Sequence, residues 1–138
     1  MRKIGFKELY KMAKEKNNPQ KISPFIEAGG VSAAILTEKG SVYTGVCIDT
    51  ACSLGMCAER NAIANMITNG ENRIVKLVCY FHDGKLWLPC GACRELLMQL
   101  DKNSGDIEIL VNYEIMEIIK LKDIVPMWWG EKDYDPEP

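Results

Sequence analysis

Two short cysteine motifs stand out in this sequence because their residues could hold a metal ion beside an acid. The first is Cys57-Ala58-Glu59, and the second is Pro89-Cys90-Gly91-Ala92-Cys93. Each motif is expected to open a helix that follows a strand, so both helix N-termini can lie at one edge of a sheet. Cys90 and Cys93 are three residues apart and face the same way on a first helical turn. The spacing therefore predicts that three thiols meet beside the carboxyl group of Glu59.

Three cysteines at two helix N-termini favour a zinc site. The positive end of a helix dipole lowers the free-energy cost of holding a thiolate. Three protein ligands leave a fourth position for water, which is the arrangement of catalytic zinc sites. We predict one zinc ion per chain, held by Cys57, Cys90 and Cys93. Glu59 lies two residues from Cys57 and can reach the bound water without being a ligand.

Two arginines and a proline are expected to support this metal site. Three thiolates around Zn²⁺ leave one net negative charge. This charge should make the bound water a weaker acid than the water of an all-histidine zinc site. Arg60 and Arg94 each directly follow a motif, and both could donate hydrogen bonds to the sulfurs. Pro89 suits the start of a helix because its missing N–H would have no partner there.

Less specific interpretations of these residues remain open. The cysteines could form a closed structural zinc site with Cys52, Cys79 or His82 as the fourth ligand. Such a site would leave Glu59 and both arginines without a purpose. Glu59 could also be an ordinary first-turn acid that the helix dipole favours.

The elements that must position these motifs are expected to alternate between strands and helices. Helices are predicted over residues 5–16, 57–68 and 90–101, and strands over 31–36, 42–48, 74–81, 107–111 and 115–120. The first two strands should form a hairpin, and strand 31–36 should be buried on both faces. A loop is expected before that strand. This order predicts an α/β domain over residues 1–130, with a sheet layered by helices, followed by a loose acidic tail over 131–138.

Composition limits the class of partner and the compartment. The chain has 138 residues, of which 47% are hydrophobic and 26% are charged, and its formal net charge is −2. Because nucleic-acid binders usually carry a basic face, no nucleic acid is expected as a partner, and a small ligand fits better. The sequence has no apolar run long enough to span a membrane, and its N-terminus is not typical of a signal peptide. We therefore expect a cytoplasmic protein without a membrane partner, in which clustered cysteines serve metal binding or catalysis.

Taken together, the motifs resemble the cytidine deaminase family in its compact, all-cysteine form. That form includes small homotetrameric enzymes and the blasticidin S deaminases. The matching stretches are Val31-Ser32-Ala33-Ala34, Cys57-Ala58-Glu59-Arg60 and Pro89-Cys90-Gly91-Ala92-Cys93-Arg94, and the resemblance extends from Val31 to Trp129. It implies a three-layer sandwich with a mixed five-stranded sheet, a homotetramer with shared active sites, and a place in pyrimidine salvage.

The same resemblance implies a reaction and a set of base contacts. A zinc-activated water would attack C4 of cytidine or deoxycytidine, and ammonia would leave. Glu59 would protonate N3 and then carry a proton to the departing amine. The backbone of Ala58 would contact the pyrimidine edge, and the carbonyl of Leu88 would accept from the exocyclic amine.

Departures from the family pattern fall on sugar recognition. The family's N-x-E on the second strand, which grips the ribose hydroxyl, reads Cys47-Ile48-Asp49 here. Its phenylalanine before the V-x-A-A strand is Gly29, and its serine before P-C-x-x-C is Leu88. Asp49 could hold the sugar or lie at a solvated strand end, and Cys47 could face the substrate or fill a buried gap.

The C-terminal part resembles blasticidin S deaminases more closely. Trp128-Trp129 matches a terminus in which a tryptophan borders the pocket, although both rings could instead pack on the core or at a subunit interface. A deaminase of a modified cytosine nucleoside such as blasticidin S is therefore the alternative enzyme. A non-catalytic zinc-containing scaffold is the alternative of another class, and the intact Glu59 speaks against it.

Overall fold

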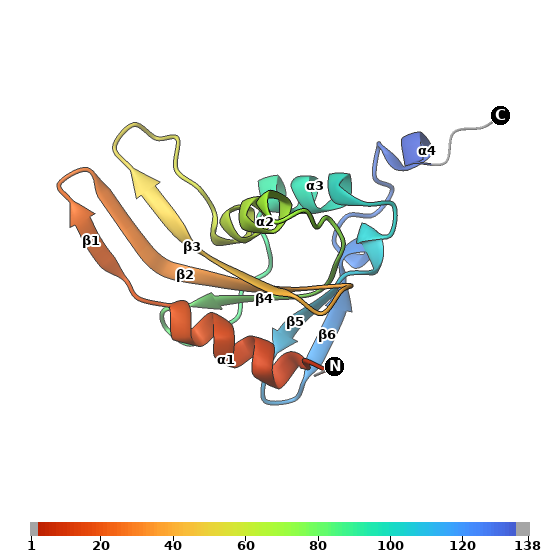
Figure 1. The fold of residues 1–138 in the computed structure, drawn as a ribbon, viewed down its shortest axis with the longest axis horizontal. Coiled ribbons are helices and arrows are strands. Elements are labelled where there is room, and N and C mark those ends of the chain that lie inside the picture. The colour runs from red at the N-terminus through yellow and green to blue at the C-terminus, as the bar shows by residue number, and fades with distance from the viewer. Residues whose placement is uncertain (1–2, 135–138) are drawn as a thin grey trace.

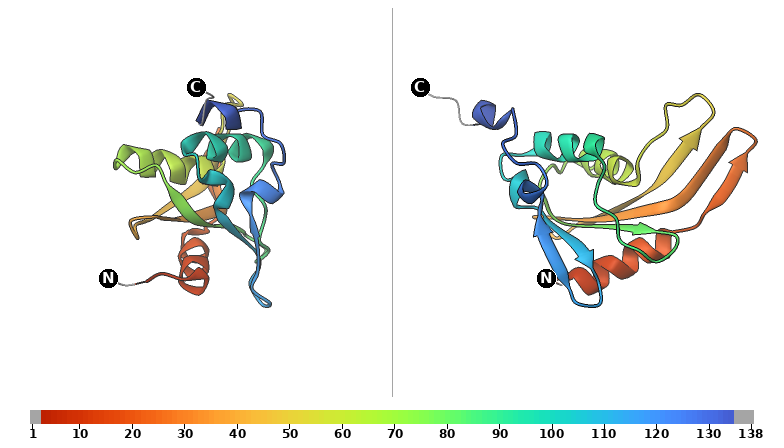
Figure 2. Two further views of the ribbon diagram at one scale, coloured as in Figure 1. Left: turned by 90° about the vertical axis from the view of Figure 1, so that its right-hand side faces the viewer. Right: turned by 180° about the vertical axis from the view of Figure 1, so that it is seen from behind.

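A mixed sheet separates two helical layers (Figure 1). The computed structural model describes residues 3–134. Helix α1 (Phe6–Lys16) covers one face of the sheet, while α2 (Ala58–Thr68) and α3 (Gly91–Leu100) lie side by side on the other (Figure 2). The six strands are β1 (Gln20–Ser23), β2 (Ile26–Thr37), β3 (Val42–Thr50), β4 (Ile74–Phe81), β5 (Glu108–Asn112) and β6 (Glu117–Lys120). The α/β sandwich predicted from the sequence is therefore confirmed.

Five of the strands run in the order β3-β2-β4-β5-β6. All neighbouring pairs are antiparallel except β4 and β5, which are parallel, and α3 makes the crossover between them. This crossover and the β3-to-β4 connection through α2 place both helices on one face. As a result, the N-termini of α2 and α3 meet over the sheet.

The sheet has six strands rather than the five expected from the sequence. The additional strand, β1, pairs with the first half of β2, where Lys21 lies opposite Glu27. A loop through Pro24 and Gly29-Gly30 was expected there, whereas β2 already begins at Ile26. The strand conformation of β1 depends on backbone pairing rather than burial, since three of its four residues are exposed. In Figure 1 this hairpin and the end of β3 form an arm that extends away from the helices.

Strand β2 is buried on both faces from Ser32 onward, as the sequence predicted. Ala33 and Ile35 pack into a core beneath α2 and α3, and Ala34 and Leu36 pack against α1. This double burial explains why small and β-branched residues follow one another in this strand.

Helix α2 lies unusually close to β3 at Gly45. A Cβ atom on Gly45 would lie 2.5 Å from the backbone nitrogen of Ala62 and 2.6 Å from the carbonyl oxygen of Ala58. No side chain fits in that space without moving the helix. The close approach therefore fixes the height of the first turn of α2 above the sheet.

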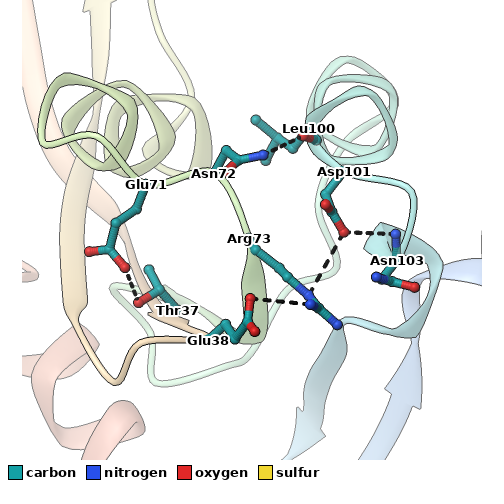
Figure 3. Close-up of polar contacts among 8 residues, drawn as sticks. All are labelled: Thr37, Glu38, Glu71, Asn72, Arg73, Leu100, Asp101 and Asn103. Carbon is teal, nitrogen blue, oxygen red and sulfur yellow. Dashed lines mark hydrogen bonds and ion pairs between the residues drawn. The ribbon is translucent and has the colours of Figure 1, made fainter. Parts of the chain in front are cut away.

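The far end of the same helical layer is held by polar contacts (Figure 3). After α2 ends, Glu71 accepts a hydrogen bond from the hydroxyl of Thr37 at 2.6 Å. Arg73 lies 3.2 Å from Glu38 and 3.9 Å from Asp101, which follows α3. These contacts join β2, α2 and α3 at the end of α2 opposite to Cys57, so they serve the fold rather than the cysteine site.

The C-terminal segment is more ordered than its polar sequence suggested. Glu131–Tyr134 forms the short helix α4, whereas a loose tail was expected over residues 131–138. The hydroxyl of Tyr134 donates to the carbonyl of Met98 at 2.8 Å, and its ring lies near Trp128. The rest of that expected tail, 135–138, lies outside the described residues. In the part of the chain that the structure describes, no helix has the length and apolar character needed to cross a membrane.

Candidate active site

The three cysteine thiols meet where α2 and α3 begin. Cys57 is the N-cap residue of α2, Cys90 is the N-cap residue of α3, and Cys93 lies in the first turn of α3. The sulfur atoms of Cys57 and Cys90 are 3.6 Å apart, and those of Cys90 and Cys93 are also 3.6 Å apart. All three sulfurs lie within 4.8 Å of one another. The structure thus brings together the residues that the sequence predicted as metal ligands.

The sulfur spacing fits a tetrahedral zinc ion. Zn–S bonds of about 2.3 Å in a tetrahedron place two sulfurs about 3.8 Å apart. The observed separations of 3.6 Å, from Cys57 to Cys90 and from Cys90 to Cys93, are close to that value. Among residues 3–134, no fourth Cys, His, Asp or Glu side chain joins the group. The donor set is therefore three thiols with one corner left for a non-protein ligand.

The proton affinities of two of the thiols differ because their surroundings differ. Burial raises the pKa of Cys93, and the nearby Glu59 carboxylate raises it further. Burial also acts on Cys90, but hydrogen bonds from the backbone of Cys93 and from the neighbouring thiols outweigh it and lower the pKa of Cys90. Zinc binds thiolates, so its binding would release protons from this cluster.

Arg60 contacts the cluster, whereas Arg94 does not. Arg60 Nη2 donates to the sulfur of Cys57 at 3.7 Å, and this hydrogen bond raises the pKa of Arg60. The expectation that Arg94 also bonds a sulfur is wrong. Arg94 Nε donates to the carbonyl of Pro89 at 2.7 Å and Nη1 to that of Ile124 at 3.3 Å, because its side chain turns back along the start of α3. Arg94 therefore holds the loop before the second motif.

Glu59 is a buried carboxyl group beside the sulfurs. It is 5% exposed and lies in the first turn of α2. Cys79 on β4 lines the same space, and burial, together with Glu59, raises the pKa of the Cys79 thiol. A buried carboxylate is costly unless a cation or hydrogen bonds offset its desolvation. A zinc ion on the three cysteines would supply that charge, so the environment of Glu59 also fits the metal.

An inner cavity of about 140 Å³ opens directly onto Glu59 and onto two of the three clustered cysteines, Cys57 and Cys90. Ala58 and Leu88, the residues expected at the pyrimidine edge, both line it. Trp87 also lines it, although the sequence analysis did not single it out. The available signal was an aromatic residue two places before the second motif.

An outer cavity of about 450 Å³ adjoins the inner one and shares Val31 and Cys47 with it. The sulfur of Cys47 accepts a hydrogen bond from the backbone of Val31 at 3.2 Å, and Asp49 lines the outer cavity. The structure therefore brings Cys47 and Asp49 together at one opening. Sequence reasoning missed Glu27, which is paired with Asp49 across β2 and β3 and lines the same cavity.

Trp128 and Trp129 lie away from both cavities. Their indole N–H groups donate to the carboxylate of Glu95 on α3 at 3.1–3.2 Å. Neither ring belongs to the linings of the two cavities. The prediction that one of them borders the pocket is not met within this chain, because Glu95 binds both rings along the side of α3.

Comparison with known proteins places this geometry among nucleoside deaminases. The model of the cytidine and deoxycytidylate deaminase zinc-binding region matches residues 7–104. A cytidine deaminase from Mycobacterium tuberculosis is 30% identical over 108 residues, which cover 78% of this chain and 77% of that protein.

Solved structures agree with the fold. A variant of the Mycobacterium tuberculosis cytidine deaminase matches with a TM-score of 0.77 at 25% identity, covering 95% of this chain and 99% of that one. The cytidine deaminase of Mycobacterium leprae has the same fold, with a TM-score of 0.74 at 24% identity over 91% of this chain and 100% of that one.

Proposed function

The chain belongs to the cytidine and deoxycytidylate deaminase family, and from that premise we propose that it is a zinc-dependent hydrolase that converts cytidine or deoxycytidine to the uridine form and releases ammonia. One observation carries the proposal: three cysteine sulfurs lie within 4.8 Å of one another beside the buried Glu59, and two of these cysteines line one cavity together with it. A closed structural zinc site would need a fourth protein ligand, and residues 3–134 add none to the group.

Each step of the reaction has a residue of this chain to support it. Zinc held by Cys57, Cys90 and Cys93 would act as a Lewis acid that makes water nucleophilic near neutral pH. Glu59 takes a proton from the attacking water as its oxygen adds to C4 of the base, and passes that proton to N3. It then carries the second proton to the amine, the C4–N4 bond breaks, and ammonia leaves.

Two further residues orient the base for this chemistry. The backbone of Ala58 and the carbonyl of Leu88 line the inner cavity and would hold the pyrimidine edge and its exocyclic amine. Arg60 donates a hydrogen bond to Cys57 and so would withdraw negative charge from the sulfurs. The bound water would then be a stronger acid than three thiolates alone would allow. Arg94 and Pro89 would keep the start of α3 in place.

The sugar would occupy the outer cavity, with Asp49 as the hydroxyl acceptor and Cys47 at the opening between the cavities. The outer cavity is larger than the inner one, 450 against 140 Å³, although a ribose and a pyrimidine are similar in size. Because the outer cavity is open to solvent, it can also admit a cytosine nucleoside with an enlarged sugar, such as blasticidin S, which is the second candidate.

Ammonia release from a panel of nucleosides tests the proposal. The zinc-loaded protein would be assayed with cytidine, deoxycytidine, blasticidin S and adenosine. We expect ammonia from at least one cytosine nucleoside and none from adenosine, because the inner cavity is small. A zinc-loaded, folded protein that releases ammonia from no cytosine nucleoside would leave the non-catalytic zinc scaffold as the better description.

We also propose that the protein is a cytoplasmic homotetramer that serves pyrimidine salvage. Three apolar side chains near the end of the arm are exposed: Ile22, Phe25 and Leu54 are 59%, 69% and 83% accessible. Apolar surface of this kind is usual where subunits meet. Light scattering should give four times the chain mass, and a fully active monomer would contradict the assembly.

A further inference from the structure

The inner cavity has an aromatic wall that the proposed reaction does not yet use. Glu59 and the cysteines line one part of it, and Trp87 is the aromatic residue of the same lining. The neighbouring stretch of β2 contributes no aromatic residue to the cavity linings, only Glu27, Ala28, Gly30 and Val31. A planar base in this space would therefore find its aromatic contact surface at Trp87.

Trp87 is held firmly enough to act as a fixed surface. Its backbone N–H donates to the carbonyl of Cys79 at 3.0 Å. Its ring stacks on Phe81, with ring centroids 4.1 Å apart and planes 13° from parallel. Phe81 belongs to β4, where it is paired with Val31, and its ring also contacts His82 at a centroid separation of 4.1 Å. A tryptophan supported at backbone and ring loses little further freedom when a ligand binds.

The row of rings also joins the two cavities. Trp87 lines the inner cavity, and Phe81 and His82 line the outer one. A nucleoside that spans both cavities would thus follow one continuous wall from base to sugar. Trp87 nevertheless remains 47% exposed, so the interior packing of the chain accounts for only part of its surface.

A side chain at position 29 could not replace this wall. Gly29 has a φ of +86°, and a Cβ atom there would collide with the carbonyl oxygen of Asn18. The loop carbonyl that occupies this space is fixed in turn, because the backbone of Asn18 donates to Gly29 at 2.9 Å. An aromatic contact for the base must consequently come from another element, and β4 with the loop after it supplies one.

We propose that Trp87, supported by Phe81, is the surface on which the pyrimidine base of the substrate stacks, and that it determines affinity for the nucleoside. This inference rests on the proposed function, since it assigns the aromatic contact of the same site. Stacking of a base on an aromatic side chain is worth about tenfold to a hundredfold in binding. Stacking acts on the whole planar base, so its loss should fall on KM and leave kcat within about threefold.

The kinetic test compares Trp87→Leu with Trp129→Leu in the zinc-loaded protein. Trp129 is a matched control because it is 72% exposed and its indole binds Glu95 rather than either cavity. We expect KM for cytidine to rise about tenfold to a hundredfold in Trp87→Leu and to stay within about twofold in Trp129→Leu. An unchanged KM in folded, zinc-loaded Trp87→Leu overturns the inference. A Trp87→Leu protein that loses its oligomeric state while KM stays unchanged overturns it as well.

A binding measurement that needs no turnover provides the second test. The chain has three tryptophans, so quenching of its fluorescence by uridine, the expected product, can be assigned with Trp87→Phe and Trp129→Phe. The quench should disappear in Trp87→Phe and persist in Trp129→Phe, and the reverse pattern overturns the inference. This result decides the question even if Trp87→Leu fails to fold.

The two proposals fail in different ways. A wild-type protein that binds uridine with quenching of Trp87 but releases no ammonia contradicts the proposed reaction and leaves the stacking surface intact. An active enzyme with wild-type KM in Trp87→Leu contradicts the stacking surface alone.

Discussion

Replacing Gly45 with alanine should displace helix α2 and, with it, the chemical side of the site. The new Cβ atom would lie 2.6 Å from the carbonyl oxygen of Ala58, whereas ordinary Cβ contacts begin at 3.4 Å. Because the obstructing atoms, including the nitrogen of Ala62 at 2.5 Å, are helix backbone, α2 must move outward by about 0.9 Å to relieve both contacts. Ala58 lies between Cys57 and Glu59, so both residues would move with it.

Both kcat and stability should respond to this displacement. A misplacement of about 1 Å in an active site can cost about 100-fold in rate, so we expect kcat of Gly45→Ala to fall roughly 10- to 100-fold. Overpacking of this kind typically costs 1–3 kcal/mol, which corresponds to a Tm lower by roughly 3–12 °C. Zinc affinity should fall as well, because Cys57 no longer meets the sulfurs of α3 at the same distance.

The assay measures kcat well below Tm, normalised to bound zinc, so that partial unfolding does not imitate the effect. Gly5→Ala makes the same chemical change where a Cβ would meet nothing within 4 Å and φ is −99°. It should leave kcat and zinc content unchanged, and any fall in Tm should be small and reflect only the N-cap position of Gly5 in α1. A Gly45→Ala protein with wild-type kcat, Tm and zinc content would refute the reasoning. It would show that the site does not depend on the height of α2 above β3.

Four further perturbations test other parts of the molecule. Glu59→Gln should keep fold and zinc but lose several orders of magnitude in kcat, since one acid–base role is worth about 10²–10⁴-fold and this residue acts more than once; activity within tenfold of wild type would contradict its role. Removal of zinc by a chelator should abolish ammonia release and lower Tm, both reversibly, and activity of fully metal-free protein would contradict the metal's role. Hydrogen bonds from Thr37 and then Tyr43 hold the pKa of Glu71 below its usual value of 4.5, so Glu71→Gln should lower Tm at pH 7. Because this stabilisation is present above the unfolded pKa and lost as pH falls through the lower folded pKa, the difference in Tm should shrink on acidification, and a constant difference would argue against it. Cys47→Asn with Asp49→Glu should raise kcat/KM for cytidine about 2- to 10-fold more than for sugar-altered analogues, and a fall for cytidine would show that ribose is held by other contacts.

The parts of the fold that were predictable from the sequence are those whose local signals agree with their burial. Strand β4 was predicted at its observed bounds because an apolar run ends at turn residues, and α2 begins after Cys57 as its motif indicated. Strand β1 was missed because its residues are exposed and its conformation depends on pairing with β2. The helix of residues 131–134 was missed because Tyr134 packs on α3, a contact that composition does not show.

The site divides in the same way. The cysteines and Glu59 could be placed together because each of the two short motifs begins a helix, and the first helical turn fixes the relative positions of its residues. Arg94 could not be placed, because its direction depends on the carbonyls of Pro89 and Ile124, and Ile124 is distant in sequence. Trp128-Trp129 was assigned to the pocket by resemblance, whereas the contact with Glu95 that directs both rings elsewhere is tertiary.

The inner and outer cavities are built on different parts of the fold, so substitutions in them should differ in their effect on stability. The inner cavity is built on helix starts that pack on the buried core, so a substitution there disturbs both chemistry and stability, as Gly45 illustrates. The outer cavity is formed largely by the arm, where Lys21, Glu27 and Asp49 face solvent in one row across β1, β2 and β3. Exposed strand residues can usually change with little effect on stability. If Asp49 holds the sugar as proposed, a chain of this kind can alter that contact without loss of the metal site, and the departure from the family pattern at Asp49 stands beside an intact set of cysteines.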